Sequence, residues 1–409
     1  MNTIFIGIAA YRDPELVPTL RDCLNQATFP ERLQFGIVWQ HSNEDDWDSL
    51  EEFSSHPQVR VIDVDYKDSK GVCWARHEMQ KLYNGEKYHL QIDSHHRFDS
   101  GWDVKLVRML QGLQKQGYNK PLLTAYATAY SPEDDQKRSR EPWKLNFDRF
   151  APDGVVHFTP GVMPNHKNLS EPVKARFLSA HFIFTLGEFC KEVTYDPEYY
   201  FHGEEISLAV RSFTHGYDLF HPHQVIIWHE YTRKNKAKHW SDNSWDDLDK
   251  IAKNRNRQLL GVDMDPVDLG VYGLGSIRSL QEYEKYAGIE FKTRRVHKHT
   301  VDELYPPTPL ENYKEQLVCY RKYCIDVYRP SVSEEDYVCW AVAFKDEAGN
   351  EIYREDASPN EINNIMNADP ENKFVQIWRK FYSNAEPKSW VVWPQTHSKG
   401  WLDRIEGKL

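Results

Sequence analysis

The first hundred residues alternate short apolar runs with amphipathic segments. The apolar runs lie in residues 3–10, 33–40, 59–66 and 88–92, and apolar side chains recur at helical spacing in residues 14–27 and 71–83. This alternation is typical of an α/β fold, in which helices cover the faces of a sheet. We therefore predict a nucleotide-binding type of sheet, with its ligand at the carboxyl ends of the strands.

One of these runs, residues 88–92, ends in the polar cluster Asp93-Ser94-His95. Residues two apart on a strand point to the same side, so Asp93 and His95 can face one ligand while Ser94 points away. A carboxylate and an imidazole at this edge suit Mn²⁺ or a similar divalent ion that bridges a diphosphate. An isolated Asp-x-His pair more often caps a helix, or its two side chains simply form a hydrogen bond with each other.

A third candidate ligand stands far along the chain. The apolar run 225–228 ends on His229, shortly before Arg233. If this run is another buried strand, it delivers His229 to the same edge as Asp93 and His95. We predict that these three side chains are the metal ligands.

Two changes of sequence character suggest the domain organisation. Residues 130–175 are polar and rich in proline, which predicts a long irregular excursion from the α/β region. After the proline cluster at 306–309 the sequence reads as strands joined by turns. We predict an α/β domain over residues 1–309 and a small, β-rich, sandwich-like accessory domain over residues 310–409.

Composition excludes several classes of partner. The net charge of −11 and the pI near 5.9 argue against a nucleic acid partner. The apolar run at residues 4–10 is far shorter than the roughly 20 residues of a membrane span, so we expect no such span. Six cysteines are scattered without the spacing of a zinc site, which fits a reducing, cytoplasmic setting.

Several segments, in order along the chain, resemble one known family. They are IFIGIAAYRDPELVPTLRDCL, GVCWARHEMQKLY, QIDSHHRF, YFHGEEISLAVRSFTHGYDLFHP and YGLGSIRSLQEYEKYAGI. Over roughly residues 3–290 they look like the N-acetylglucosaminyltransferases of glycosyltransferase family 60. A more distant resemblance is to the polypeptide N-acetylgalactosaminyltransferases. Neither resemblance explains the C-terminal part of the chain.

The resemblance implies a GT-A-type fold and a retaining transferase that moves GlcNAc from UDP-GlcNAc to a hydroxyl acceptor. The acceptor would be a protein hydroxyproline, serine or threonine, or a glycan, and residues 130–175 would lie on the acceptor side. The distant relatives bind Mn²⁺ through an Asp-x-His motif and one later histidine. In this sequence Asp93, His95 and His229 match that pattern.

The expected reaction needs contacts to a nucleotide sugar. A sugar that leaves UDP builds negative charge on the β-phosphate, which a metal ion and nearby cations must meet. The predicted nucleotide-sugar contacts are Ala10, Tyr11, Arg12, Asp13, Gln40, Trp74, Arg76, Ser94 and Arg233. Two alternatives stay open, because Arg12 and Asp13 could form a simple salt bridge and Trp74 could pack in the core.

The predicted catalytic residues surround a helix start. Glu204 and Glu205 follow Gly203, and this segment resembles a Gly-Glu-Asn segment of the distant relatives, with a carboxylate in place of the amide at Glu205. One acid at a helix start is ordinary dipole compensation, whereas two suggest that one orients sugar or acceptor hydroxyls. His202 is the third candidate, although a histidine on such an aromatic segment, like His181, is more often structural.

Two other functional classes remain as alternatives. A metallohydrolase could use the same Asp and His cluster, but it usually needs further ligands to hold an activated water. A carbohydrate-binding or scaffolding protein could use Trp378, Trp390 and Trp393 as a sugar platform. Aromatic residues at alternating strand positions are more often core than binding surface, which makes this second class the weaker one.

Overall fold

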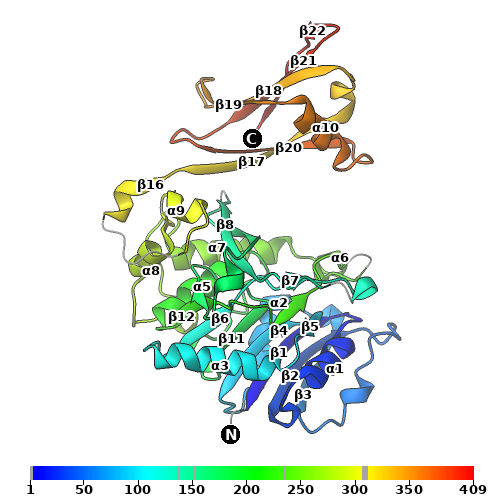
Figure 1. Cartoon of the computed structure of the whole chain (residues 1–409), viewed down its shortest axis with the longest axis vertical. Coiled ribbons are helices and arrows are strands. Elements are labelled where there is room, and N and C mark those ends of the chain that lie inside the picture. Colours follow the sequence, from blue (N-terminus) through cyan, green and yellow to red (C-terminus); the bar gives the residue numbers. More distant parts are fainter. Residues whose placement is uncertain (1–2, 136–137, 152, 234–235, 306–311) are drawn as a thin grey trace. The chain divides into compact units, whose positions relative to one another are not determined.

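A computed structural model describes residues 3–135, 138–151, 153–233, 236–305 and 312–409. The chain divides into two compact units, Met1–Glu315 and Gln316–Leu409, which are described separately (Figure 1). The domain boundary predicted between residues 309 and 310 lies outside the described residues. Within the described part of the chain, no helix has both the length and the apolar character that a membrane span requires.

The first unit is built on a mixed sheet of eight described strands in the order β10-β12-β6-β11-β4-β1-β2-β3. These strands are β1 (Ile4–Tyr11), β2 (Leu33–His41), β3 (Val59–Asp65), β4 (Tyr88–Asp93), β6 (Pro121–Thr124), β10 (Val173–Lys174), β11 (Phe182–Leu186) and β12 (Asp218–His221). Strands β4, β1, β2 and β3 run parallel, whereas β11 is antiparallel to β4. The carboxyl ends of the four parallel strands therefore lie along one edge of the sheet.

Helices cover both faces of this sheet (Figure 1). The longer ones are α1 (Leu16–Gln26), α2 (Val72–Gln80), α3 (Trp102–Lys115), α5 (Glu204–Thr214), α7 (Asp246–Leu260) and α8 (Leu280–Ala287). The short ones are α4 (Phe189–Glu192), α6 (His239–Asp242) and α9 (Lys298–Val301).

The packing of β1 shows how one strand serves both faces. Its side chains alternate, so that Ile6 and Ile8 pack in the main core with residues of α1 and α3, whereas Phe5 packs against Met79 of α2. A strand covered on both sides must be apolar at nearly every position. This requirement explains the unbroken apolar run at the start of the chain.

A second, smaller sheet lies beside the carboxyl edge. It consists of β5 (His96–Phe98), β13 (Ile227–His229) and β7 (Thr128–Ala129). Strand β13 pairs antiparallel with β5, and the register places His229 opposite His96. A further hairpin, β14 (Ile289–Glu290) with β15 (Arg295–His297), follows α8.

The excursion at residues 130–175 differs from the irregular stretch that the sequence predicted. Its middle forms an antiparallel hairpin of β8 (Trp143–Phe150) and β9 (Val156–Val162). In β8 the apolar residues Trp143, Leu145 and Phe147 alternate with polar ones, which is the period of a strand. The high proline content of the neighbouring residues predicted an irregular segment, although this short alternating pattern is that of a strand.

The second unit is rich in β structure. Strand β17 (Tyr320–Tyr328) pairs with β20 (Phe374–Tyr382), and the other described strands are β16 (Leu317–Val318), β18 (Tyr337–Lys345), β19 (Glu351–Ala357), β21 (Ser389–Thr396), β22 (Gly400–Trp401) and β23 (Ile405–Lys408). The helix α10 (Pro359–Asn367) contributes Ile362 to a separate core around Trp340. The predicted fold class, a mixed sheet flanked by helices with a β-rich C-terminal part, is confirmed.

The tryptophans of the second unit occupy different environments. Trp390 is buried in the core, and Trp393 is partly buried beside Trp401, with 4.4 Å between their ring centroids. Trp378 is exposed on β20. The three rings named in the sequence analysis therefore do not form one exposed platform.

Candidate active site

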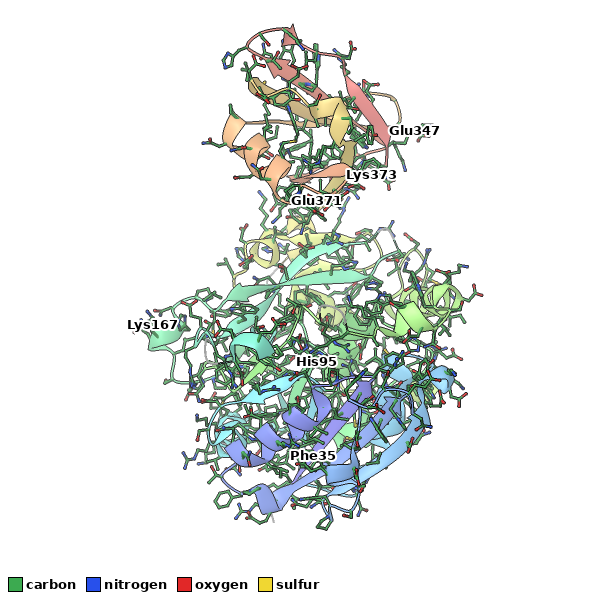
Figure 2. The ribbon with its side chains drawn as sticks, turned by 90° about the vertical axis from the view of Figure 1, so that its right-hand side faces the viewer. Phe35, His95, Lys167, Glu347, Glu371 and Lys373 are labelled. Carbon is green, nitrogen blue, oxygen red and sulfur yellow. The ribbon has the colours of Figure 1, made fainter. Side chains whose placement is uncertain are left out.

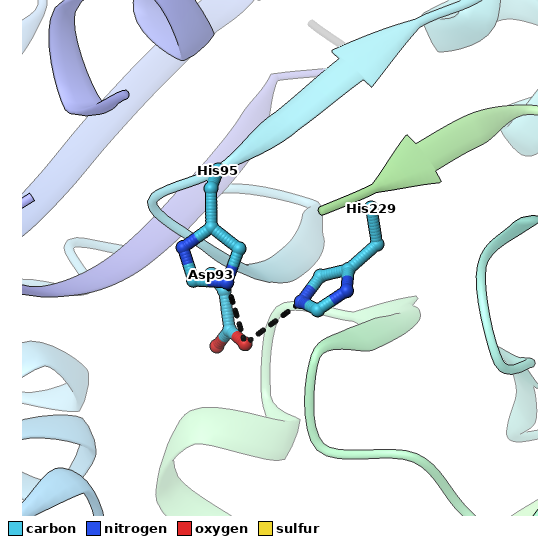
Figure 3. Close-up of side chains that lie close together, drawn as sticks. All are labelled: Asp93, His95 and His229. Carbon is cyan, nitrogen blue, oxygen red and sulfur yellow. Dashed lines mark hydrogen bonds and ion pairs between the residues drawn. The ribbon is translucent and has the colours of Figure 1, made fainter. Parts of the chain in front are cut away.

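Asp93 and His95 meet a side chain from a distant part of the chain, His229, at the carboxyl edge of the main sheet (Figure 3). Asp93 is the last residue of β4, and the pairing of β13 with β5 brings His229 beside His95. The Nε2 atoms of His229 and His95 lie 3.3 Å and 3.8 Å from the same oxygen, Asp93 Oδ2. The three candidate ligand atoms all lie within 4.8 Å of one another.

The chemistry of these donors fits a divalent metal ion. One carboxylate oxygen and two imidazole nitrogens form a mixed O/N set of the kind that Mn²⁺ and similar ions accept. His95 and His229 are buried, and Figure 2 shows His95 among the side chains inside the first unit. Burial lowers the pKa of His229 to about 3, so its ring is neutral, as a metal ligand must be.

Asp13 holds His95 in a binding orientation. Its Oδ2 lies 2.7 Å from His95 Nδ1 and accepts a hydrogen bond from the Ser94 hydroxyl at 2.7 Å. A proton on Nδ1 that faces this carboxylate leaves the lone pair of Nε2 directed at Asp93. Burial opposes the charge on Asp13, but His95 and Arg233 keep the pKa of Asp13 below its usual range.

Arg76 links the candidate metal cluster to the start of α5. This buried guanidinium contacts Asp93 Oδ1 at 2.6 Å and also pairs with Glu204. It projects from α2, which begins behind Gly71 at φ +104°. A Cβ at Gly71 would lie 2.8 Å from the Tyr200 ring, so glycine permits both the turn and the close approach. With Oδ1 engaged by Arg76, Oδ2 of Asp93 is left to face the two imidazoles.

Glu204 and Glu205 have different surroundings. Glu204 is buried and ion-paired with Arg76. Glu205 accepts hydrogen bonds from the backbone N–H of Ala180 and from the Ser179 hydroxyl, both at 3.0 Å. No cation contacts its carboxylate among the described residues, and burial raises the pKa of Glu205 to about 7. Glu204 is therefore held as the partner of Arg76, whereas the Glu205 carboxyl group has no such ion pair among the described residues.

Two cavities meet at the cluster. The first encloses about 980 Å³, part of it open to solvent, and is lined by the strand-end residues Tyr11 and Gln40. The second encloses about 940 Å³ on the same basis and is lined by Glu205 and by residues 155–158. The residues common to both are Arg76, Asp93, Phe201, His229 and Tyr231. Asp93 and His229 therefore lie on the wall that the cavities share, and His95 lines the first cavity beside them.

The sequence profile of the family described as glycosyltransferase (GlcNAc) matches residues 3–57 and 47–293, which is more than half of the chain. The chain belongs to this family. The expected resemblance to the GlcNAc transferases is thereby confirmed. No curated protein sequence matches the chain.

Solved structures similar to this chain include GalNAc-T7 with UDP, GalNAc and Mn²⁺, at a TM-score of 0.48 and 14% identity. That match covers 69% of this chain but only 50% of the other. A second is S. aureus TarS 1-349 in complex with UDP-GlcNAc, at a TM-score of 0.40 and 12% identity, with 61% of this chain and 64% of that chain covered. The chain thus spans about half to two thirds of the length of these two chains.

The predicted nucleotide-sugar contacts fall into two groups in the structure. Those that line the first cavity are Tyr11, Gln40, Arg76, Ser94 and Arg233. The others lie elsewhere. Ala10 is buried in the core, Trp74 packs beside the cluster around Met79, and Arg12 pairs with Asp45 and Asp242. Asp13 supports His95 from outside the cavity lining.

The predicted catalytic residue His202 is exposed and lines the second cavity, with its ring centroid 5.6 Å from that of His157. His181 also lines this cavity, but its Nε2 accepts a hydrogen bond from the backbone N–H of Ala127 at 3.1 Å. His202 is therefore the ring of the two with access to a ligand.

Several cavity residues escaped the sequence analysis. In the first cavity they include Tyr200, Phe201, Tyr231, His239 and Trp240. All come from loops or from the short helix α6, where no periodic pattern predicts the direction of a side chain. Only Tyr231 had a sequence signal, since it lies two residues after His229.

Proposed function

We propose that this protein is a metal-dependent, retaining glycosyltransferase that moves GlcNAc from UDP-GlcNAc to a hydroxyl of a protein or glycan acceptor. The observation that carries the proposal is the cluster of Asp93, His95 and His229 where two cavities meet, with Asp93 and His229 on the wall that both cavities share. Membership of the GlcNAc glycosyltransferase family supports the choice of donor. The cytoplasmic location expected from the cysteines stays a prediction.

In this proposal the first cavity takes the nucleotide. Tyr11 and Gln40 lie at the ends of adjacent parallel strands and are register partners, which is where α/β sheets hold nucleotides. Asp93, His95 and His229 would hold Mn²⁺ or a similar ion against the diphosphate. The ion would supply positive charge where negative charge develops on the departing β-phosphate. Arg233 lines the same cavity and can add to this charge.

The second cavity takes the sugar and the acceptor. The two terminal nitrogens of Arg76 pair with Asp93 and Glu204, so we assign Arg76 to holding these two carboxylates rather than to binding phosphate. Glu205 faces the second cavity and is the acid that we assign to sugar or acceptor hydroxyls. His202, at the exposed end of the same segment, is the further candidate for such a contact.

The test is UDP release from UDP-GlcNAc by the purified protein. We expect release that depends on Mn²⁺ and stops when the metal is removed with EDTA, and we expect Asp93→Asn to abolish it. Asp326→Asn, on the exposed face of the second unit, is the matched control and should behave as wild type. NMR of the product should show the α-anomer of the donor retained.

Other outcomes would decide against the proposal. Absence of UDP release with a panel of UDP-sugars would exclude the transferase. Metal-dependent hydrolysis of unrelated phosphate esters with no sugar transfer would instead favour the metallohydrolase alternative. Inverted configuration in the product would contradict the retaining mechanism.

A further inference from the structure

Three exposed aromatic side chains converge where the two cavities meet. Phe201 is 47% exposed, Tyr231 is 41% exposed and Trp240 is 46% exposed. They come from the loop before α5, the segment after β13 and helix α6. Phe201 and Tyr231 line both cavities, and the ring centroids of Phe201 and Trp240 lie 6.0 Å apart. Large apolar rings grouped at a cavity mouth indicate a surface that a ligand covers.

The position of Tyr231 is fixed by its contacts. Its hydroxyl donates a hydrogen bond to the Ala127 carbonyl at 2.7 Å, and its ring centroid lies 4.3 Å from that of His229. Phe201 packs edge to face on His202, with centroids 5.2 Å apart. The ring of Tyr231 is therefore held directly beside His229, a candidate metal ligand, at the point where the bond to UDP would break.

The charge of the second cavity limits what it can bind. Its ionised lining groups are carboxylates and one guanidinium, Arg76, which is already paired with Asp93 and Glu204. Among the residues that the structure describes, no lysine and no other arginine lines this cavity. A phosphorylated or carboxylated acceptor would find no unpaired arginine or lysine there among the described residues and would face Glu205. A neutral acceptor with hydroxyl groups has hydrogen-bond partners in Glu205 and His202.

We propose that the acceptor is a neutral glycan whose terminal pyranose ring stacks on Phe201 and Tyr231 at this junction. This inference rests on the proposed function. A pyranose has an apolar C–H face that packs on aromatic rings and a rim of hydroxyls that form hydrogen bonds, so one ring uses both features of the site. The part of the second cavity that a small molecule can occupy is about 330 Å³, near the lower end of the range of about 300–1,000 Å³ of pockets for drug-sized ligands, and such a volume accommodates a pyranose ring.

The transfer is balanced without a further reactant. The acceptor hydroxyl oxygen forms a bond to the anomeric carbon of GlcNAc as the bond from that carbon to the UDP oxygen breaks. The hydroxyl proton passes to the departing UDP. The products are the extended glycan and UDP.

The experiment offers the full-length protein UDP-GlcNAc and Mn²⁺ with two acceptor sets: neutral hexopyranosides and short neutral oligosaccharides, or peptides that contain serine, threonine and hydroxyproline. We expect neutral glycans to accelerate UDP release and to gain one GlcNAc by mass spectrometry. We expect Phe201→Ala to raise the KM for the glycan about tenfold, more than it raises the KM for UDP-GlcNAc. Phe201→Tyr should restore the glycan KM, because it keeps the ring.

A matched control and a binding measurement complete the test. Trp47 is as exposed as Phe201, at 49%, and lines neither cavity, so Trp47→Ala should leave the KM for the glycan unchanged. Saturation-transfer NMR should detect a neutral disaccharide bound in the presence of UDP and Mn²⁺, and Phe201→Ala should weaken this signal. Acceleration by peptides but not by glycans, or an unchanged glycan KM in Phe201→Ala, would overturn this proposal alone. Absence of UDP release with every donor would overturn the proposed function, and this proposal with it.

Discussion

Asp13 shows how a single residue can serve the site without lining a cavity. Its position directly after the first strand predicts a nucleotide contact. In the structure its carboxylate is buried and faces His95 Nδ1. A carboxylate in this place selects the ring tautomer and fixes the ring, which is the common arrangement around histidine ligands.

We predict that Asp13→Asn weakens Mn²⁺ activation of UDP release. The amide can accept a hydrogen bond from Nδ1 but carries no charge, and loss of such a partner typically costs about 10- to 100-fold in metal affinity. The measurement is the Mn²⁺ concentration at half-maximal UDP release. A wild-type Mn²⁺ requirement in this variant would show that His95 needs no support from Asp13.

Glu205 is a second residue whose surroundings change its ionisation. Its pKa is raised from 4.5 to about 7 by burial. A carboxyl group with a higher pKa in the folded than in the unfolded state stabilises the fold at low pH. This contribution is lost as the pH rises from about 4.5 towards about 7, because the unfolded chain ionises more readily.

We therefore predict that Glu205→Gln changes the pH dependence of stability. The amide cannot ionise, so the melting temperature of wild type relative to the variant should fall between pH 5 and pH 8, by a few degrees. Thermal melts followed by circular dichroism at both pH values measure this difference. Glu44→Gln, at an exposed position, should show no such trend. A constant difference between wild type and Glu205→Gln would mean that the carboxyl group does not titrate in this range.

At the scale of secondary-structure elements, the pairing of β5 with β13 completes the candidate metal site. Strand β5 follows the Asp-Ser-His cluster directly, and its partner β13 ends on His229. The backbone N–H of Glu230 also donates a hydrogen bond to the His95 carbonyl at 3.2 Å. Backbone pairing of two short strands therefore closes a gap of more than a hundred residues in sequence.

We predict that His95→Ala and His229→Ala weaken Mn²⁺ binding to a similar degree, and that the double variant is little worse than either. Ligands of one ion act as a unit, so their effects do not add. Calorimetric titration of Mn²⁺ in the presence of UDP measures all three variants. His223→Ala, which removes a histidine outside both cavities, is the control. Additive losses would indicate that the two histidines do not share an ion.

At the scale of the whole molecule, the two units have separate cores. The core of the first unit surrounds the main sheet, and that of the second surrounds Trp340. Each candidate site residue named above belongs to the first unit. Since a compact unit with its own core can fold alone, we expect the donor site to form without residues after 315.

We predict that a truncated chain of residues 1–315 folds and binds UDP with a Kd within about threefold of the full-length value. Such a difference corresponds to less than about 0.7 kcal/mol, which is small against a specific nucleotide site. Isothermal titration calorimetry with UDP and Mn²⁺ measures it. A soluble, folded fragment that fails to bind UDP would show that the second unit helps to build the donor site.

The sequence by itself determined the elements whose signals are local. The largely apolar runs of β1, β2 and β4 follow from burial on both faces, and the two-residue spacing of Asp93 and His95 follows from the pleat of a strand. The apolar run 225–228 likewise predicts that His229 lies at the end of a buried strand. Periodicity carries such information because it reflects the immediate surroundings of each residue.

Only the tertiary structure decided which distant groups meet. Nothing local in the sequence distinguishes Asp13 as a partner of His95, or Arg76 as the bridge between Asp93 and Glu204. The aromatic junction of Phe201, Tyr231 and Trp240 is built from three loop or short-helix segments that have no period to reveal which way a ring points. These arrangements depend on long-range packing and charge pairing, which the order of residues along the chain does not display.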